Sequence, residues 1–449
     1  MIRQNFNADW TVEKGDGNSR MNSFLGNTQT KTVHLPYDAM IHEARTPDTK
    51  NGAQTGFYPG GEYIFQKHFT APQAWQGKPV SLVFEGVYQT ALVYLNGWLL
   101  TRNVNGYAEF TVEAGPYLKY GADNLLKVIA DNSLEPNSRW YTGSGIYRPV
   151  RLLVGNKVYL PQDTVRITTR EADEGFALLD VTAQVQSAST VTERVTLQQT
   201  ICRKGTAVLT DRQNLLLQPG ESRTVSFRYC VDSPALWSPE NPNLYTSTMQ
   251  VLEGEEELDR EETGFGIRTL SIDAAHGVRI NGQTVKLRGA CIHHDNGILG
   301  AATLPDAEER RIRQLKEAGF NAIRSSHHPA GRALLDACDR YGVLVMDELS
   351  DVWNVRKNPY DYALYFEQDW KPTIQKMVAK DYNHPSVILY CVGNEISEVG
   401  SESGAETNRR LCNTFRELDP TRYTTNALNG LMAAGYRLRE IMGLSLIHI

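Results

Sequence analysis

The chain has 449 residues, a formal net charge of −6, 41% hydrophobic residues and 22% charged residues, which is typical of a globular protein with two to four domains. Charges of both signs are scattered along it, so no basic stripe or polybasic segment points to nucleic acid or to an anionic membrane. Residues 1–10 lack the basic-then-apolar pattern of a secretory signal, and no run of about 18 apolar residues occurs. We therefore expect a cytoplasmic protein that acts on a neutral or weakly polar substrate.

The cysteines lie far apart, at positions 202, 230, 291, 338, 391 and 412, and none forms a C-x-x-C pair. This spacing indicates neither a zinc site nor a disulfide framework. We expect reduced thiols, and pairing of Cys202 with Cys230 is the alternative in an oxidising compartment.

Residues 1–157 contain short apolar strands separated by turn residues. Examples are the segments 80–85, 91–95 and 125–130, of which the second is followed by Asn96-Gly97, a strong hairpin signal. Regular turns without a helical period predict a jelly-roll β-sandwich. Residues 158–270 alternate apolar and polar positions, as in 177–185 and 222–228, and their length suits an immunoglobulin-like β-sandwich.

From residue 271 onward the pattern changes to alternating strands and helices. The predicted strands are 285–290, 320–325, 343–347, 387–392 and 423–427, and the predicted helices are 306–319, 331–341, 369–382 and 406–418. Alternation at this spacing predicts a parallel sheet. After two β-sandwiches we expect residues 271–443 to form an incomplete (β/α)₈ TIM barrel with about five of its eight units.

Polar side chains follow four successive predicted strands of this barrel. They are His293-His294-Asp295, Ser325 to His328, Asp347-Glu348 and Asn394-Glu395. Because the carboxyl ends of barrel strands meet at one face, these residues are expected to form one ring. Glu395 stands where an apolar strand reaches solvent, which suits a general acid. No second catalytic carboxylate is apparent in this chain.

Several motifs, in the same order across all three regions, resemble those of glycoside hydrolase family 2. They are Ser138 to Arg148, Leu236 to Pro242, Gly264 to Arg268, Arg288 to Asp295, Ile323 to Pro329 and Gly393 to Ile396. The chain resembles most closely the β-galactosidase branch. The resemblance implies a sugar-binding jelly roll, an immunoglobulin-like domain and a catalytic barrel. It implies a retaining exo-β-glycosidase for terminal β-linked sugars, foremost β-galactosides, with β-glucuronidase or another family 2 activity as the alternative.

The resemblance also implies roles for individual residues. Glu395 matches the family's acid/base, and Asn394 matches the residue that hydrogen-bonds the sugar 2-hydroxyl group. His293 and His327 match histidines that contact sugar hydroxyls or the transition state. Asp131, from the jelly roll, resembles a residue that grips the terminal sugar.

Two features depart from the family pattern. The nucleophile of the family is a second Glu at the end of a later strand, and this chain does not contain it. The best-known β-galactosidases place a magnesium-binding Glu four residues after the Glu of the Asp-Glu pair, whereas Val352 stands there in this chain. We therefore expect no required metal or cofactor, and magnesium or sodium lacks support.

The residues alone leave other interpretations open. Glu395 can be a salt-bridged loop residue, and Asn394 can be a turn former. The histidines at 293, 294, 327 and 328 can bind sugar, serve the fold or bind a metal. Because successive strand residues point to opposite sides, each His pair offers only one ring to the barrel mouth.

The aromatic and acidic candidates have alternatives as well. Trp353 follows the third barrel strand and can either stack on a pyranose ring or pack in the core. Trp140 and Trp237 are expected in the core or at an interface. Asp347 and Glu348 are expected to orient other groups or to form salt bridges. For Asp131, the alternative is a turn residue.

Residues 444–449, Leu-Ser-Leu-Ile-His-Ile, match one reading frame of a widely used transposon sequencing adapter. We expect this tail to be non-native and the chain to be a C-terminally truncated fragment. An inactive carbohydrate-binding fragment is then the alternative to an enzyme. The expected partner is a carbohydrate substrate, without nucleic acid or membrane, and homo-oligomerisation of a longer form is left open.

Overall fold

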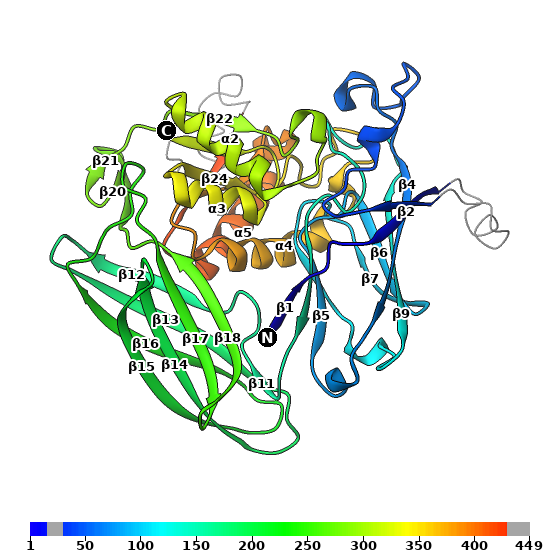
Figure 1. Cartoon of the computed structure of the whole chain (residues 1–449). Helices are drawn as coiled ribbons and strands as arrows, with labels where there is room; N and C mark the ends of the chain where they lie inside the picture. Colours follow the sequence, from blue (N-terminus) through cyan, green and yellow to red (C-terminus); the bar gives the residue numbers. More distant parts are fainter. Residues whose placement is uncertain (16–29, 429–449) are drawn as a thin grey trace.

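The computed structural model describes residues 1–15 and 30–428, so the expected non-native tail lies outside the described residues. Two β-sandwiches flank a mixed region of helices and parallel strands (Figure 1). The predicted fold class, a jelly-roll sandwich, an immunoglobulin-like sandwich and a partial TIM barrel, is confirmed. Within the described residues no helix is long and apolar enough to cross a membrane.

The first sandwich consists of two antiparallel sheets. One contains β1 (Ile2–Asn5), β10 (Val150–Val154), β5 (Val80–Phe84) and β8 (Phe110–Glu113), and the other contains β3 (Lys31–Val33), β2 (Trp10–Gly15), β4 (Gly61–Thr70), β9 (Asp123–Asn132), β6 (Thr90–Leu95) and β7 (Trp98–Asn103). Every second residue of β9 is buried, so one face of its sheet enters a core around Trp10, Phe65 and Phe84. Asn96 and Gly97 join β6 to β7 at positive φ, as the hairpin signal predicts.

The second sandwich pairs two four-stranded antiparallel sheets. They contain β11 (Val158–Tyr159), β13 (Phe176–Ser187), β12 (Arg166–Ala172) and β16 (Ser222–Asp232) in one sheet, and β15 (Thr206–Leu217), β14 (Glu193–Arg203), β17 (Tyr245–Glu253) and β18 (Glu256–Phe265) in the other. Buried residues alternate along β13 and β16 and meet in a separate core. Cys202 on β14 and Cys230 on β16 are free thiols.

A small sheet of β19 (Leu270–Asp273), β20 (Gly277–Ile280) and β21 (Gln283–Thr284) leads into the barrel region. There the parallel sheet runs in the order β22 (Gly289–Ile292), β23 (Ala322–Ser325), β24 (Leu344–Glu348), β25 (Val387–Asn394) and β26 (Tyr423–Ala427). The first predicted strand was placed too early, because Val285 still pairs with Val278 and Asn321 binds the backbone of Lys286 and Arg288.

The helices of this region are α2 (Pro305–Glu317), α3 (Arg332–Tyr341), α4 (Phe366–Asp381) and α5 (Glu402–Leu418). Their apolar faces pack with the strands into one core that includes Leu335, Ile374, Tyr390 and Phe415. All eight residues of β25 are buried, as expected for a central parallel strand with both faces covered.

The two sandwiches contact the parallel sheet at opposite ends. Arg268, after β18, donates to the carbonyl oxygens of Pro385 (2.6 Å) and Val387 (2.8 Å), where β25 begins. Arg139, after β9, contacts Glu395, where β25 ends. The first sandwich therefore reaches the face at which barrel enzymes place their chemistry, and the second sandwich supports the other end.

Candidate active site

Glu395 follows directly on β25, and its side chain is 43% exposed. Its backbone lies in the left-handed region with φ at 46°, and its N–H donates to the carbonyl of Ala427 on β26 at 2.8 Å. A left-handed conformation costs a non-glycine residue about 1 kcal/mol or more. The end of the buried strand therefore turns sharply and presents this carboxylate to solvent.

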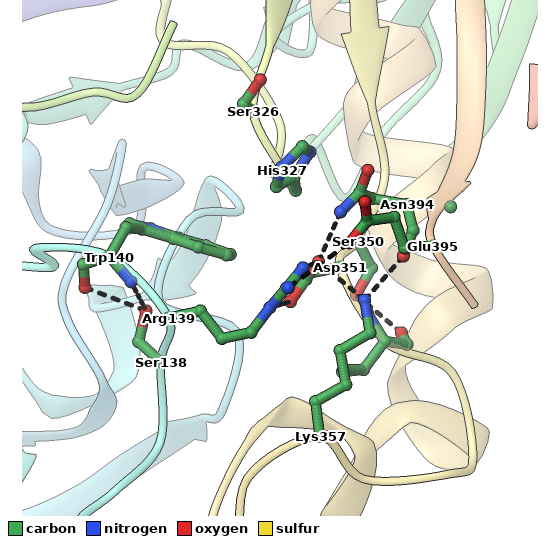
Figure 2. A network of polar contacts seen from close by, with 12 residues as sticks. Ser138, Arg139, Trp140, Ser326, His327, Ser350, Asp351, Lys357, Asn394 and Glu395 are labelled. Carbon is green, nitrogen blue, oxygen red and sulfur yellow. Dashed lines mark hydrogen bonds and ion pairs between the residues drawn. The ribbon is translucent and has the colours of Figure 1, made fainter. Parts of the chain in front are cut away.

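A network of charged and amide groups surrounds Glu395 (Figure 2). Arg139 donates through Nε and Nη2 to Asp351, at 3.0 and 2.6 Å, and its Nη1 lies 3.4 Å from Oε2 of Glu395. Asn394 donates from Nδ2 to Asp351 at 2.8 Å. Lys357 donates to Asp351 at 2.9 Å and to the backbone carbonyl of Asn394 at 2.7 Å. The first sandwich and two barrel loops thus meet at one carboxylate.

Asp351 is the centre of this network. Burial raises the pKa of its carboxyl group, but hydrogen bonds from Arg139, Lys357 and Asn394 outweigh burial and hold the pKa below its usual value. Asp351 is therefore ionised at neutral pH, and its negative charge is matched by two nearby cations.

A second ion pair lies beneath Asn394. Arg324 on β23 donates to both oxygens of Glu348, at 2.6 and 2.9 Å, and also to Oδ1 of Asn394 at 2.9 Å. His327 Nδ1 lies 3.2 Å from each oxygen of Glu348. The oxygen and the nitrogen of the Asn394 side-chain amide thus both make hydrogen bonds, which fixes the orientation of this side chain.

The four histidines separate into two pairs. His293 and His327 form one ring cluster with Trp140, with His293 stacked on the indole at 5.0 Å, His327 edge-on to it at 5.6 Å, and the two imidazoles 5.8 Å apart. His294 and His328 are buried on the other side, where His328 stacks on Tyr107 at 4.1 Å. The two pairs therefore lie in different surroundings, although all four histidines follow the ends of β22 and β23. The four rings therefore do not converge on one metal-binding position.

The buried pair is held neutral. Burial lowers the pKa of His294 to about 3 and lowers the pKa of His328 well below its usual value. Nε2 of His294 donates to the carbonyl of Thr142 at 2.9 Å, which is a contact with the first sandwich. These two histidines serve the interface between sandwich and barrel.

Asp347 and Glu348 are fully buried at the end of β24. Oδ1 of Asp347 accepts hydrogen bonds from the backbone N–H groups of Ala330 and Glu348, at 2.8 and 3.0 Å. Burial and the neighbouring Asp381 raise the pKa of Asp347 well above its usual range. Both acids hold neighbouring groups in place, in keeping with the expected orienting role.

A pocket opens between the first sandwich and the barrel. Its wall includes Asn137 and Trp140 from the sandwich, and His327, Asp351 and Tyr362 from the barrel. Polar groups and aromatic rings on opposite walls are the surfaces that a sugar requires, because a pyranose combines hydroxyl groups with apolar C–H faces.

Of the predicted site residues, His327 lines this pocket, whereas Glu395, Asn394, His293, Trp353 and Asp131 do not. Trp353 is fully buried, and its Nε1 donates to the carbonyl of Val392 at 2.9 Å, so its ring packs in the core and is not available for stacking. Asp131 accepts hydrogen bonds from the backbone N–H and hydroxyl of Ser133, at 3.0 and 2.6 Å, in the manner of a turn residue. It does not line the pocket.

Trp140 lies at the interface, as expected, and forms part of the pocket wall, whereas Trp237 is fully buried. Sequence reasoning did not single out Arg139, Asp351 or Lys357. Arg139 lies inside a recognised motif, but 212 residues separate it from Asp351, and one sequence carries no signal that pairs two such distant positions.

One group of potential metal ligands lies elsewhere among the described residues. Asp336, Asp339 and His384 have ligand atoms within 4.8 Å of one another. Asp339 already accepts from Nδ1 of His384 at 2.6 Å and from the backbone N–H of Ser386 at 3.0 Å. These residues belong to α3 and to the segment before β25, at the end of the sheet away from Glu395.

Three profiles of one family match successive parts of the chain. They are described as glycosyl hydrolase 2 galactose-binding domain-like (residues 10–176), glycosyl hydrolases family 2 (158–268) and glycosyl hydrolases family 2, TIM barrel domain (274–436). The β-galactosidase BoGH2A of Bacteroides ovatus is 37% identical over 406 residues, which are 90% of this chain and 48% of that protein. A putative β-glucuronidase of Formosa agariphila is 32% identical over 428 residues, which are 95% of this chain and 40% of that protein.

Solved structures agree with the sequence matches. A glycosyl hydrolase family 2 member from Bacteroides cellulosilyticus has a TM-score of 0.93 at 36% identity and covers 98% of this chain and 58% of its own. β-Glucuronidase 2 of Bacteroides uniformis, covalently bound to cyclophellitol-6-carboxylate aziridine, has a TM-score of 0.83 at 26% identity, over 98% and 54% of the two chains.

Two β-sandwiches joined to a parallel barrel sheet, with three profiles of one family matching in the same order, place the chain in the glycoside hydrolase class. The chain belongs to glycoside hydrolase family 2. It spans about half the length, or less, of these two curated relatives.

Proposed function

We propose that this chain carries the acid/base half of the active site of a retaining exo-β-glycosidase, and that Glu395 is the acid/base. The observation that carries the proposal is the exposed carboxylate of Glu395 at the carboxyl end of β25, joined by Arg139 to Asp351, which lines a pocket between the first sandwich and the barrel. In the first step Glu395 protonates the glycosidic oxygen, and in the second step it deprotonates water.

The neighbours of Glu395 suit this chemistry. The amide of Asn394 is fixed by Arg324 and Asp351 next to the acid, where it can meet the sugar 2-hydroxyl group. His293 and His327 form a ring cluster with Trp140, and Nδ1 of His327 contacts Glu348 beneath Asn394. Donors held in place before the substrate arrives stabilise developing charge without reorganisation.

Retention requires a second carboxylate about 5 to 5.5 Å from the acid, as nucleophile. Asp351 does not suit this role, because Arg139, Lys357 and Asn394 already engage its oxygens. Glu348 is buried and paired with Arg324. We propose that the nucleophile comes from a segment beyond the described residues, as the length of the relatives suggests.

A terminal β-galactoside is the proposed substrate, because BoGH2A, at 37% identity, is a β-galactosidase. β-Glucuronides are the alternative, because the Formosa agariphila relative is described as a putative β-glucuronidase and a structural relative is a β-glucuronidase. A third possibility from a different class is a sugar-binding fragment without turnover.

The test compares this chain with a chimera. Residues 1–428 are continued by the C-terminal half of BoGH2A, and both proteins are assayed with nitrophenyl β-galactoside and nitrophenyl β-glucuronide. We expect turnover of the galactoside by the chimera and none by the 449-residue chain. A chimera that is folded but inactive on both substrates contradicts the proposed function. Sustained turnover by the chain alone contradicts the assignment of the nucleophile to another segment.

A further inference from the structure

The position of the family's magnesium ligand holds Val352, whose side chain is buried and offers no ligand atom. The neighbouring carboxylate, Asp351, accepts four hydrogen bonds. Its Oδ2 accepts from Nε of Arg139, and its Oδ1 accepts from Nη2 of Arg139, Nζ of Lys357 and Nδ2 of Asn394. Magnesium binds through carboxylate oxygens with free lone pairs and a near-octahedral shell. The residues present do not fit that ion.

Two fixed positive charges occupy the surroundings of this carboxylate. The side chain of Lys357 is 10% exposed, as is that of Asp351, and the guanidinium of Arg139 lies between Asp351 and Glu395. A divalent cation placed here would face strong repulsion from both groups. The charge that a metal would supply is already present in the chain.

We infer that Arg139 and Lys357 take the place of a metal ion at this site, and that Arg139 is a positioning residue that holds Glu395 for acid/base chemistry. This inference rests on the proposed function of Glu395. The ammonium of Lys357 bonds to the backbone carbonyl of Asn394 and the guanidinium of Arg139 contacts the carboxylate of Glu395. Together they hold the backbone at Asn394 and the side chain of Glu395.

Because of these contacts, the first sandwich contributes side chains directly to the site on the barrel. Arg139 lies between Ser138 and Trp140, both of which line the pocket. Indole Nε1 of Trp140 donates to the hydroxyl of Tyr107 at 3.0 Å, which anchors the loop to its own domain. A shift of this loop would therefore move the guanidinium away from Glu395 and expose the charge of Asp351.

The decisive experiment is a titration of the complete 449-residue chain with Mn²⁺, as a probe for Mg²⁺, by calorimetry. It compares the wild type, Asp351→Asn and the double variant Arg139→Met/Lys357→Met. We expect no binding in the wild type that depends on Asp351. In the double variant the freed carboxylates should raise the affinity for Mn²⁺ at least roughly tenfold over that of the wild type. Adding Asp351→Asn to the double variant should remove that gain.

The inference is overturned if the wild type binds Mn²⁺ and Asp351→Asn abolishes that binding. This comparison needs no double variant, so it decides even if the double variant does not fold. Binding that survives Asp351→Asn but disappears in His384→Ala belongs to the group of Asp336, Asp339 and His384. Such binding agrees with the expectation that Asp351 binds no Mn²⁺ in the wild type.

The positioning role is tested in the chimera. Arg139→Met should lower kcat roughly 10- to 100-fold with little change in KM, and Arg139→Lys should restore part of the loss. A matched control is Arg170→Met, which removes an exposed guanidinium from the second sandwich. An Arg139→Met variant with unchanged kcat would refute the positioning role. A chimera without any activity would refute the proposed function and leave the titration as the test of this inference.

Discussion

The two β-sandwiches contact the same parallel sheet at opposite ends, and the side chains that they use differ in kind. The first sandwich presents Trp140 to a pocket and the partly exposed Arg139 to the carboxylate of Glu395. The second sandwich inserts the buried guanidinium of Arg268 against two backbone carbonyls at the start of β25. The first interface is open to solvent beside the pocket, whereas the second is buried and holds the second sandwich to the barrel. Similar sandwiches thus acquire different roles from the end of the sheet that each one meets.

The largest effect is expected at the first interface, from Glu395→Gln in the chimera. A nitrophenolate departs with little protonation, whereas a sugar alcohol needs the acid. We expect a loss of roughly 10² to 10⁴-fold on a lactose-like substrate and a smaller loss on the activated one. Azide should restore turnover of the activated substrate. Equal losses on both substrates, without rescue by azide, would show that Glu395 is not the acid/base.

A substitution at the second interface should lower the free energy of unfolding. Arg268→Met leaves the carbonyl of Pro385 without its buried donor and the carbonyl of Val387 with Nε of Arg422 as its remaining side-chain donor. Such losses cost about 2 to 4 kcal/mol. Urea unfolding of the chain measures the change. A free energy of unfolding within error of the wild type would show that the second sandwich is not held to the barrel in this way.

Acid should weaken the first interface. Because the pKa of His294 is lowered to about 3 and that of His328 is also lowered, the unfolded chain takes up protons below about pH 6.5 that the folded chain does not. Stability is therefore lost as pH falls below that value. For His294 this should cost about 2 kcal/mol between pH 7 and pH 5, and His328 acts in the same direction. Urea unfolding at both pH values measures this, and His294→Gln should reduce the difference.

At the second interface the sign is opposite for His384. Burial lowers its pKa, but the carboxylate of Asp339 outweighs burial and raises the pKa overall. The stabilisation from His384 is fully present below about pH 6.5 and is lost as pH rises through the folded pKa. His384→Asn should therefore destabilise the chain more at pH 5 than at pH 8. The reverse order would contradict the assigned ion pair.

The smallest effect is expected away from both interfaces. Arg228 and Arg170 both bind Asp180 on the surface of the second sandwich. Exposed pairs of this kind contribute little, so Arg228→Met should leave the free energy of unfolding close to that of the wild type. A larger loss would indicate that solvent-exposed pairs carry part of the stability assigned here to the buried interface.

The fold was predictable because its signals are local. Period-two alternation marks β13, and an apolar run followed by Asn394-Glu395 marks β25 and its polar end. The separation of the histidines into two pairs agrees with the expectation, although they lie just beyond the ends of β22 and β23. Side-chain exposure was not predictable for Trp353, because packing against Val392 depends on the assembled core. Nor was the role of Arg139, because its partners come from loops that only the tertiary fold brings together.

The central claim is that the first sandwich serves the chemistry and the second serves the fold. The most direct test measures kcat and thermal stability together for Arg139→Met and Arg268→Met in the chimera. We expect Arg139→Met to lose activity at nearly unchanged Tm, and Arg268→Met to lose Tm while the folded fraction keeps its kcat. Parallel losses of kcat and Tm in both variants would contradict the division of roles.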